Sequence, residues 1–112
     1  MLGLLRAPDD LELDVPTGVI VKHRATGSAD VVVRFVTRVD DLERQLDRPA
    51  AMVRAAGCLW IAWPKRSSGV TTDMGDHVVR QLALARGLVD DKVCAVDTTW
   101  TALRVVWRLD RR

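Results

Sequence analysis

The residues best suited to ligand binding lie in a short basic loop that follows an unbroken apolar run at residues 58–63. An apolar run without polar alternation predicts a strand covered on both faces, as in a parallel sheet between helices. Open α/β sheets hold their ligands at the loops after such strands. This loop precedes a predicted helix start, where free backbone N–H groups and the helix dipole favour an anion. Its candidate binding residues are Lys65, Arg66, Ser67, Ser68 and Gly69.

A second polar segment, residues 97–100, separates the last two predicted strands. We expect Asp97 and Trp100 to share a contact surface with the basic loop, and that surface to take an anionic small molecule or a protein. An exposed tryptophan at a turn also predicts contact with a partner or with a second copy of the chain, through the edge hairpin. The alternative is that the loop cations are solvated and that Asp97 only bonds turn backbone. Asp73 would then cap the following helix or pair with Lys65 or Arg66.

The titratable residues provide no recognisable catalytic set. Neither His23 nor His77 has a partner at the spacing of a metal site or a catalytic triad. Cys58 and Cys94 lie in apolar runs and are predicted to be reduced, buried thiols, which indicates a cytoplasmic location. We therefore assign no catalytic residue, metal or cofactor, and predict a non-catalytic binding or regulatory module.

Composition excludes several classes of protein. The 112 residues are 48% hydrophobic and 29% charged, which fits a single globular domain over residues 1–112. A net charge of +2 is too small to predict nucleic-acid binding. The apolar runs are far shorter than the ~20 residues that cross a bilayer, so no membrane association is expected.

The elements that must position these residues follow an α/β order. Apolar spacing predicts one or two helices over residues 40–56, with Asp40 and Glu43 as a capping box and Gly57 as the end. A further helix is predicted from about Asp73 to a left-handed Gly87. Arg34, inside a central strand, needs a carboxylate partner or a place at the sheet end. Strands are predicted at residues 2–5, 11–15, 19–21, 31–36, 58–63, 92–96 and 101–107.

This order predicts a three-layer Rossmann-like α/β fold, with a mostly parallel sheet and a C-terminal antiparallel hairpin. The topology resembles a reduced form of the S-adenosylmethionine-dependent methyltransferase sheet, so a diverged enzyme of that kind is the alternative function. That cofactor is normally held by a glycine-rich turn after the first strand and an acidic residue ending the second. Here residues 5–9 contain no glycine, and the second strand ends at Lys22, His23 and Arg24.

Two sequence segments together carry a resemblance to a known family. They are Trp60-Ile61-Ala62-Trp63-Pro64-Lys65 with Ser68-Gly69-Val70-Thr71-Thr72-Asp73, and Lys92-Val93-Cys94-Ala95-Val96-Asp97 with Trp100. The chain resembles the domain of unknown function 3052 family over nearly its whole length from Leu4 onward. The resemblance implies a small bacterial Rossmann-like domain of unassigned activity, and it implies no catalytic residue.

Overall fold

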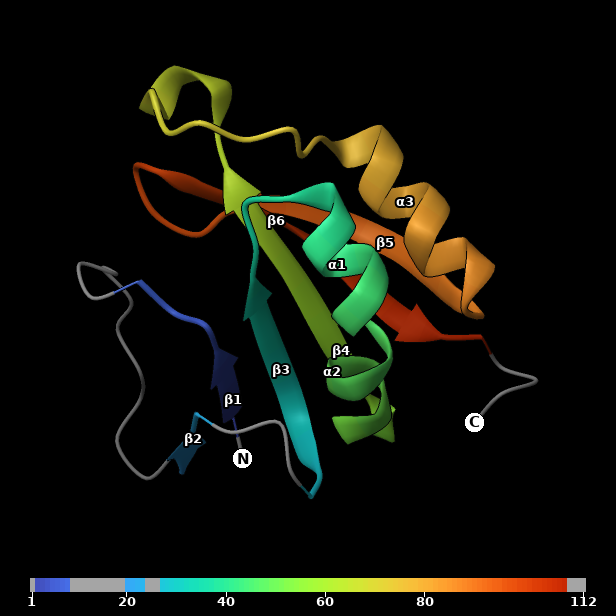
Figure 1. Ribbon diagram of the computed structural model, residues 1–112. Helices are drawn as coiled ribbons and strands as arrows, with labels where there is room; N and C mark the ends of the chain where they lie inside the picture. Colours follow the sequence, from blue (N-terminus) through green and yellow to red (C-terminus); the bar gives the residue numbers. More distant parts are fainter. Residues whose placement is uncertain (1, 9–19, 24–26, 109–112) are drawn as a thin grey trace.

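The computed structural model describes residues 2–8, 20–23 and 27–108 of the chain. In this part, six strands form one sheet and three α-helices pack on it (Figure 1). None of the described helices is long and apolar enough to cross a membrane. In chain order the elements are β1 (Leu2–Leu5), β2 (Val21–Lys22), β3 (Ala29–Phe35), α1 (Val39–Gln45), α2 (Asp47–Met52), β4 (Val53–Pro64), a 3-10 helix (Arg66–Ser68), α3 (Asp76–Ala85), β5 (Leu88–Ala95) and β6 (Trp100–Trp107).

The sheet is mixed, with the strand order β2-β1-β3-β4-β6-β5. β1 pairs in parallel with β2 and β3, and β3 pairs in parallel with β4. β6 is antiparallel to both of its neighbours, β4 and β5, which confirms the predicted C-terminal hairpin. The remaining five described strands therefore share one direction, and their carboxyl ends lie at one edge of the sheet.

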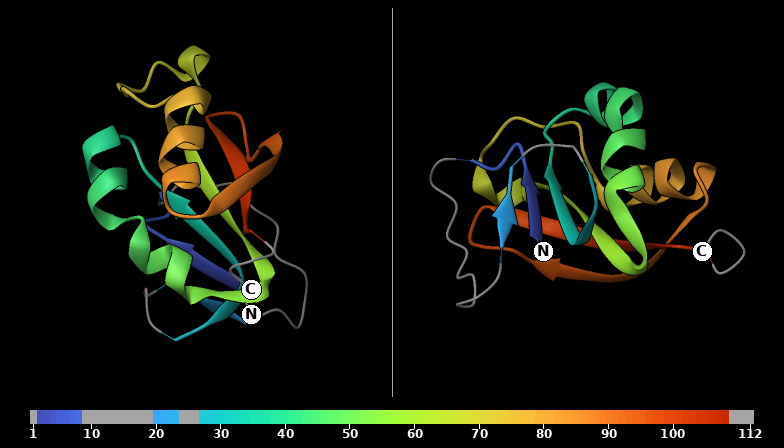
Figure 2. Two further views of the ribbon diagram at one scale, coloured as in Figure 1. Left: turned by 90° about the vertical axis from the view of Figure 1, so that its right-hand side faces the viewer. Right: turned by 90° about the horizontal axis from the view of Figure 1, so that it is seen from below.

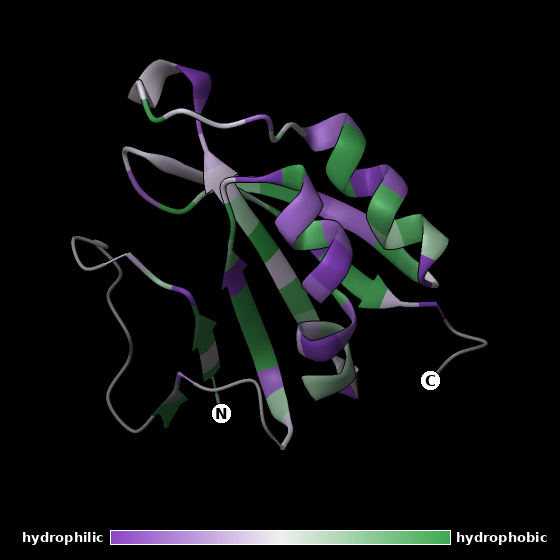
Figure 3. Ribbon diagram, in the orientation of Figure 1, coloured by the Kyte–Doolittle hydropathy of each residue, from purple (hydrophilic) through white to green (hydrophobic). Residues whose placement is uncertain are grey.

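The described helices cover one face of the sheet, as the two rotated views in Figure 2 show. Side chains alternate between the faces of a strand, so β4 sends Leu59, Ile61 and Trp63 toward the helices. They join one large buried cluster with residues of α1, α2 and α3, and the apolar strand centres stand out in Figure 3. A third layer stays a prediction, because most of the connection from β1 to β2 lies outside the described residues.

A second buried cluster lies on the sheet face opposite the helices. Its centre is an edge-to-face contact between the rings of Phe35 and Trp100, with centroids 5.2 Å apart and planes at 84°. Because β3 alternates, Val33 and Phe35 belong to this cluster while Val32 belongs to the helix side. The other buried members are Leu4, Ala62 and Ala102.

The helix predicted over residues 40–56 ends earlier than expected. It is interrupted at Leu46 and finishes at Met52, after which the chain runs directly into β4. Gly57 therefore lies inside a strand, and its prediction as a helix end was wrong. A Cβ atom there would lie 2.3 Å from the backbone oxygen of Asp30, so glycine allows β3 and β4 to approach.

Helix termini also differ from the sequence predictions. Neither α1 nor α3 has a side-chain cap from its own N-cap residue, which is Arg38 in α1 and Gly75 in α3. The capping box at Asp40 and the α3 start at Asp73 were thus wrong. Gly87 has φ 84°, which confirms its predicted left-handed conformation. The strand predicted at residues 11–15 lies outside the described residues.

Candidate functional site

The basic loop and the hairpin tip lie side by side at the carboxyl end of β4. The backbone N–H of Lys65 donates to the carbonyl oxygen of Thr99 at 2.8 Å. The Lys65 ammonium group donates to the carbonyl oxygen of Asp97 at 2.9 Å. The two segments, more than 30 residues apart in sequence, therefore form one surface, as the sequence led us to expect.

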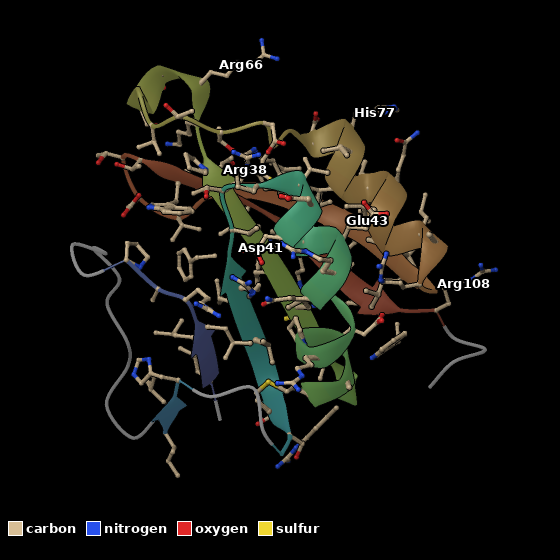
Figure 4. The ribbon with its side chains drawn as sticks, in the orientation of Figure 1. Arg38, Asp41, Glu43, Arg66, His77 and Arg108 are labelled. Atoms are coloured by element: carbon tan, nitrogen blue, oxygen red, sulfur yellow. The ribbon has the colours of Figure 1, made fainter. Side chains whose placement is uncertain are left out.

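Several polar groups of this surface are engaged in hydrogen bonds within it. Ser68 Oγ donates to the carbonyl oxygen of Lys65 at 2.6 Å, and Gly69 closes the 3-10 helix in a left-handed conformation. Asp97 Oδ1 accepts the backbone N–H groups of Thr99 and Trp100, both at 2.8 Å, as expected of a turn aspartate. Arg66 instead extends into solvent (Figure 4) and Ser67 is also exposed. The ligand role of this surface stays a prediction.

Trp100 is not the exposed contact residue that its place near a turn predicted. Only 9% of its surface is exposed, because β6 begins at this residue. Its backbone lies opposite Pro64 in the sheet, and the pleat directs the indole onto Phe35. Trp100 therefore belongs to the buried cluster, and this prediction was wrong.

Asp73 caps a helix other than the predicted one. Its Oδ1 accepts the backbone N–H of Val39 at 2.8 Å, at the first residue of α1. The neighbouring Thr72 hydroxyl donates to the carbonyl oxygen of Thr37 at 2.7 Å. Since each helix begins with free N–H groups, a carboxylate from a distant segment stabilises α1 as a local cap would. The loop before α3 is thereby tied to the β3–α1 turn.

Removing this cap is expected to destabilise the fold measurably. Asp73→Ala should lower the free energy of unfolding by about 1 kcal/mol, the usual value of a lost N-cap. Asp73→Asn keeps an acceptor oxygen and should lose less. Urea unfolding followed by circular dichroism measures both variants. Equal losses in the two would contradict the capping role of the hydrogen bond.

A pocket of about 260 Å³ lies beside the point where the strand order reverses, between β1 and β3. After β1 the chain continues to β2, which lies on one side of β1 in the sheet, while β3 lies on the other side of β1. Such a switch point opens a crevice at the carboxyl ends of the strands, which is where α/β sheets hold ligands. The pocket is lined by residues from the ends of β1, β2 and β3 and from the α1–α2 region, namely Leu5, Arg6, His23, Arg34, Gln45, Arg48 and Pro49.

Arg34 is the fixed cation of this pocket. It is 4% exposed, and its guanidinium lies 3.4 Å from Asp41 Oδ2 and 3.2 Å from Gln45 Oε1, both on α1. It also donates to the carbonyl oxygen of Phe35. The predicted carboxylate partner is thus Asp41, which projects from α1 in Figure 4. Burial lowers the pKa of the Arg34 guanidinium, Asp41 acts in the opposite direction, and the nearby Arg6 charge lowers it further.

The other basic residues of the pocket are held less tightly. Within the described part of the chain, Arg6, His23 and Arg48 form no hydrogen bond or ion pair, and all three are exposed. Arg6 directly follows β1 with φ 61°, a left-handed conformation that is rare for a residue with a side chain. Strained backbone of this kind is concentrated at functional sites. No carboxylate belongs to the described lining of the pocket.

Sequence reasoning missed this pocket, although it noted several of its residues. The turn at Arg6 was noted only because it lacks the glycine of a cofactor-binding turn, and His23 only because it lies at the end of the second strand. The available signal was the placement of basic residues at the ends of neighbouring parallel strands. Among the described residues, no group of three or more His, Cys, Asp or Glu side chains is arranged to hold a metal ion.

Comparisons with known proteins identify the fold. No protein-family model and no curated protein sequence matches the chain. The chain resembles magnesium protoporphyrin IX methyltransferase (ChlM) from Synechocystis PCC 6803 with bound SAH, with a TM-score of 0.58 and 11% identity over 80% of this chain and 50% of that one. The same enzyme with bound SAM gives 0.59 and 11% over 79% and 45%. A LepI variant in complex with SAH and a substrate analogue gives 0.56 and 10% over 84% and 32%.

This likeness is one of fold. The chain spans about half the length of the methyltransferase structures and about a third of LepI. The shared feature is a mixed α/β sheet like that of the methyltransferase.

Proposed function

We propose that this chain is a ligand-binding domain on a methyltransferase-like α/β sheet, and that the pocket between β1 and β3 holds a small anionic molecule. One observation carries the proposal: Arg6, Arg34 and Arg48 line the pocket together with His23, and its described lining contains no carboxylate. Asp41 compensates Arg34, but Arg6 and Arg48 have no carboxylate partner among the described residues. Such cations around a concave site attract an anion and discriminate against a cation.

Arg34 gives the proposed site a preorganised donor. Its contacts with Asp41 and Gln45 hold the guanidinium in place before any ligand arrives. Less conformational entropy is therefore lost when the ligand binds. Arg6 and Arg48 supply further N–H donors, and arginine suits this role because its planar fork can bind two oxygens of one anion.

The surface formed by the basic loop and the hairpin tip is proposed as a second contact site. It comprises Lys65, Arg66, Ser67, Ser68 and Gly69 with Asp97 and Trp100, of which Trp100 would contribute backbone only. Arg66 is exposed, and its side chain points into solvent. We further propose a protein partner or a second copy of the chain for this surface, membership of the domain of unknown function 3052 family, and a cytoplasmic location.

A second candidate function is methyl transfer from S-adenosylmethionine. The fold likeness to a methyltransferase solved with bound SAM and SAH supports it. The residues present do not fit this cofactor well. The basic residues Arg6 and His23 follow β1 and β2, at the places where a glycine-rich turn and an acidic residue normally hold it. We derive no methyl-transfer step for this chain.

A thermal-shift screen separates these two functions. Anionic metabolites should raise the melting temperature of the wild-type protein, because a ligand that binds only the folded state stabilises it. The variant Arg6→Gln/Arg48→Gln should weaken that binding by about 100-fold, since each charge-assisted hydrogen bond contributes about 1.5 kcal/mol or more.

The matched control is Arg44→Gln, which makes the same change of charge on α1. Arg44 is absent from the pocket lining and bonds the carbonyl oxygen of Asp40. Its variant should keep the full shift. A shift with S-adenosylmethionine but with no anion would overturn the main proposal in favour of methyl transfer.

A further inference from the structure

We infer that the anion is the phosphoryl group of a small phosphomonoester, held between Arg6, Arg34 and Arg48. This inference rests on the proposed function and adds the chemical class of the ligand. Three properties of the pocket lead to it: its charge, the directions from which its cations come, and its size.

The charge of the pocket matches a doubly charged anion. Three arginines line it, and the neighbouring Asp41 neutralises one of them, so about two positive charges remain. A phosphomonoester carries roughly −1.5 to −2 at neutral pH. A single carboxylate would balance only one of these two charges. His23 adds a further hydrogen-bonding side chain to the lining.

The cations come from three separate elements. Arg6 follows β1, Arg34 lies on β3, and Arg48 lies on α2. Donors that converge from different segments suit an anion whose oxygens point in several directions, and a phosphoryl group has three acceptor oxygens. A planar carboxylate, by contrast, is satisfied by the fork of one arginine. The arrangement therefore favours a tetrahedral anion.

The size and apolar wall of the pocket indicate what the phosphoryl group is attached to. Its volume of about 260 Å³ lies just below the ~300–1,000 Å³ of drug-sized ligand sites, which suits a small molecule better than a dinucleotide. Leu5 and Pro49 add an apolar surface that a free phosphate ion would not use. A small organic group esterified to phosphate fits both the cations and this wall.

Isothermal titration calorimetry on the full chain tests this inference. The probes are glucose 6-phosphate and adenosine monophosphate as phosphomonoesters, inorganic phosphate, and citrate and malate as carboxylate anions. At least one phosphomonoester should bind more tightly than inorganic phosphate and than both carboxylates. Arg6→Gln and Arg48→Gln should each weaken its binding by about 10-fold, while Arg44→Gln should leave it unchanged. Far-ultraviolet circular dichroism checks that each variant is folded.

Phosphorus NMR of the bound ester supplies an independent measurement. Guanidinium groups stabilise the dianion, so the second pKa of the phosphate, about 6 in solution, should fall on binding. Arg6→Gln should reduce that fall. An ester bound elsewhere on the surface would show no dependence on Arg6 or Arg48.

The outcomes distinguish the two levels of the proposal. If citrate or malate binds in an arginine-dependent manner and no phosphomonoester does, the phosphomonoester class is wrong and the anion site stands. If inorganic phosphate binds as tightly as every ester, the inference that the ligand carries an organic group is wrong. If no anion binds, or if binding is unchanged in both arginine variants, the inference and the proposed function both fail.

Discussion

Replacing Trp100 by alanine is expected to lower the free energy of unfolding by about 3–5 kcal/mol, the usual loss for a large buried aromatic residue. The indole is 9% exposed and contacts the Phe35 ring edge-to-face. It lies on the sheet face that no described helix covers, so no described helix is in position to close the cavity. Urea unfolding, followed by tryptophan fluorescence and circular dichroism, measures the effect.

Two other variants show whether the loss comes from packing. Trp100→Phe keeps an aromatic ring against Phe35 and should lose distinctly less stability. Trp60→Ala removes an indole that is only partly buried on the same face, and should also cost less. If Trp100→Ala instead changed ligand or partner binding at nearly unchanged stability, the residue would be a contact residue after all.

Gly57→Ala is expected to destabilise the protein by about 3 kcal/mol, at the upper end of the cost of inserting one methyl group. The added Cβ would lie 2.3 Å from the Asp30 carbonyl oxygen and 3.2 Å from that of Arg54. Both obstacles are backbone, so no side chain can rotate away. The register between β3 and β4 also shifts between Ala29 and Val31, beside this contact. The strands must separate locally to admit the methyl group.

Gly75→Ala is the matched control for this experiment. A Cβ atom at Gly75 would meet nothing within 4 Å. Its variant should lower the free energy of unfolding by no more than about 1 kcal/mol, because glycine is preferred to alanine at an N-cap but the added methyl group meets no backbone there. Comparable losses at the two positions would show that the approach of β3 and β4 tolerates a side chain.

The sequence predicts those parts of the fold that local patterns determine. The apolar run in β4, the closing hairpin and the left-handed Gly87 each depend on a few adjacent residues, and the structure confirms them. The cap that Asp73 provides for α1 depends on a contact 34 residues away, which no spacing rule reveals. Gly57 was predicted to end a helix. Glycine occurs both at helix ends and inside strands whose backbones approach closely, and only the approach of β3 distinguishes the two cases.

The candidate site was predictable to a similar extent. Carboxyl ends of parallel strands meet at one sheet edge, so the closeness of Lys65 and Asp97 followed from topology. Trp100 could not be placed, because its burial depends on the face to which the first residue of β6 points. The pocket between β1 and β3 gathers arginines from three segments with no fixed spacing, so only the assembled sheet reveals it.

The position of β6 between β4 and β5 determines when this sheet can be completed. β5 is made before β6 during synthesis, yet its described strand neighbour is β6 alone. Until residues 100–107 have left the ribosome, β5 has no described strand to pair with, and the edge of β4 that pairs with β6 stays open. Between the synthesis of β4 and that of β6, the nascent chain therefore presents an open apolar strand edge, the kind of segment that chaperones bind and that aggregates when released too early.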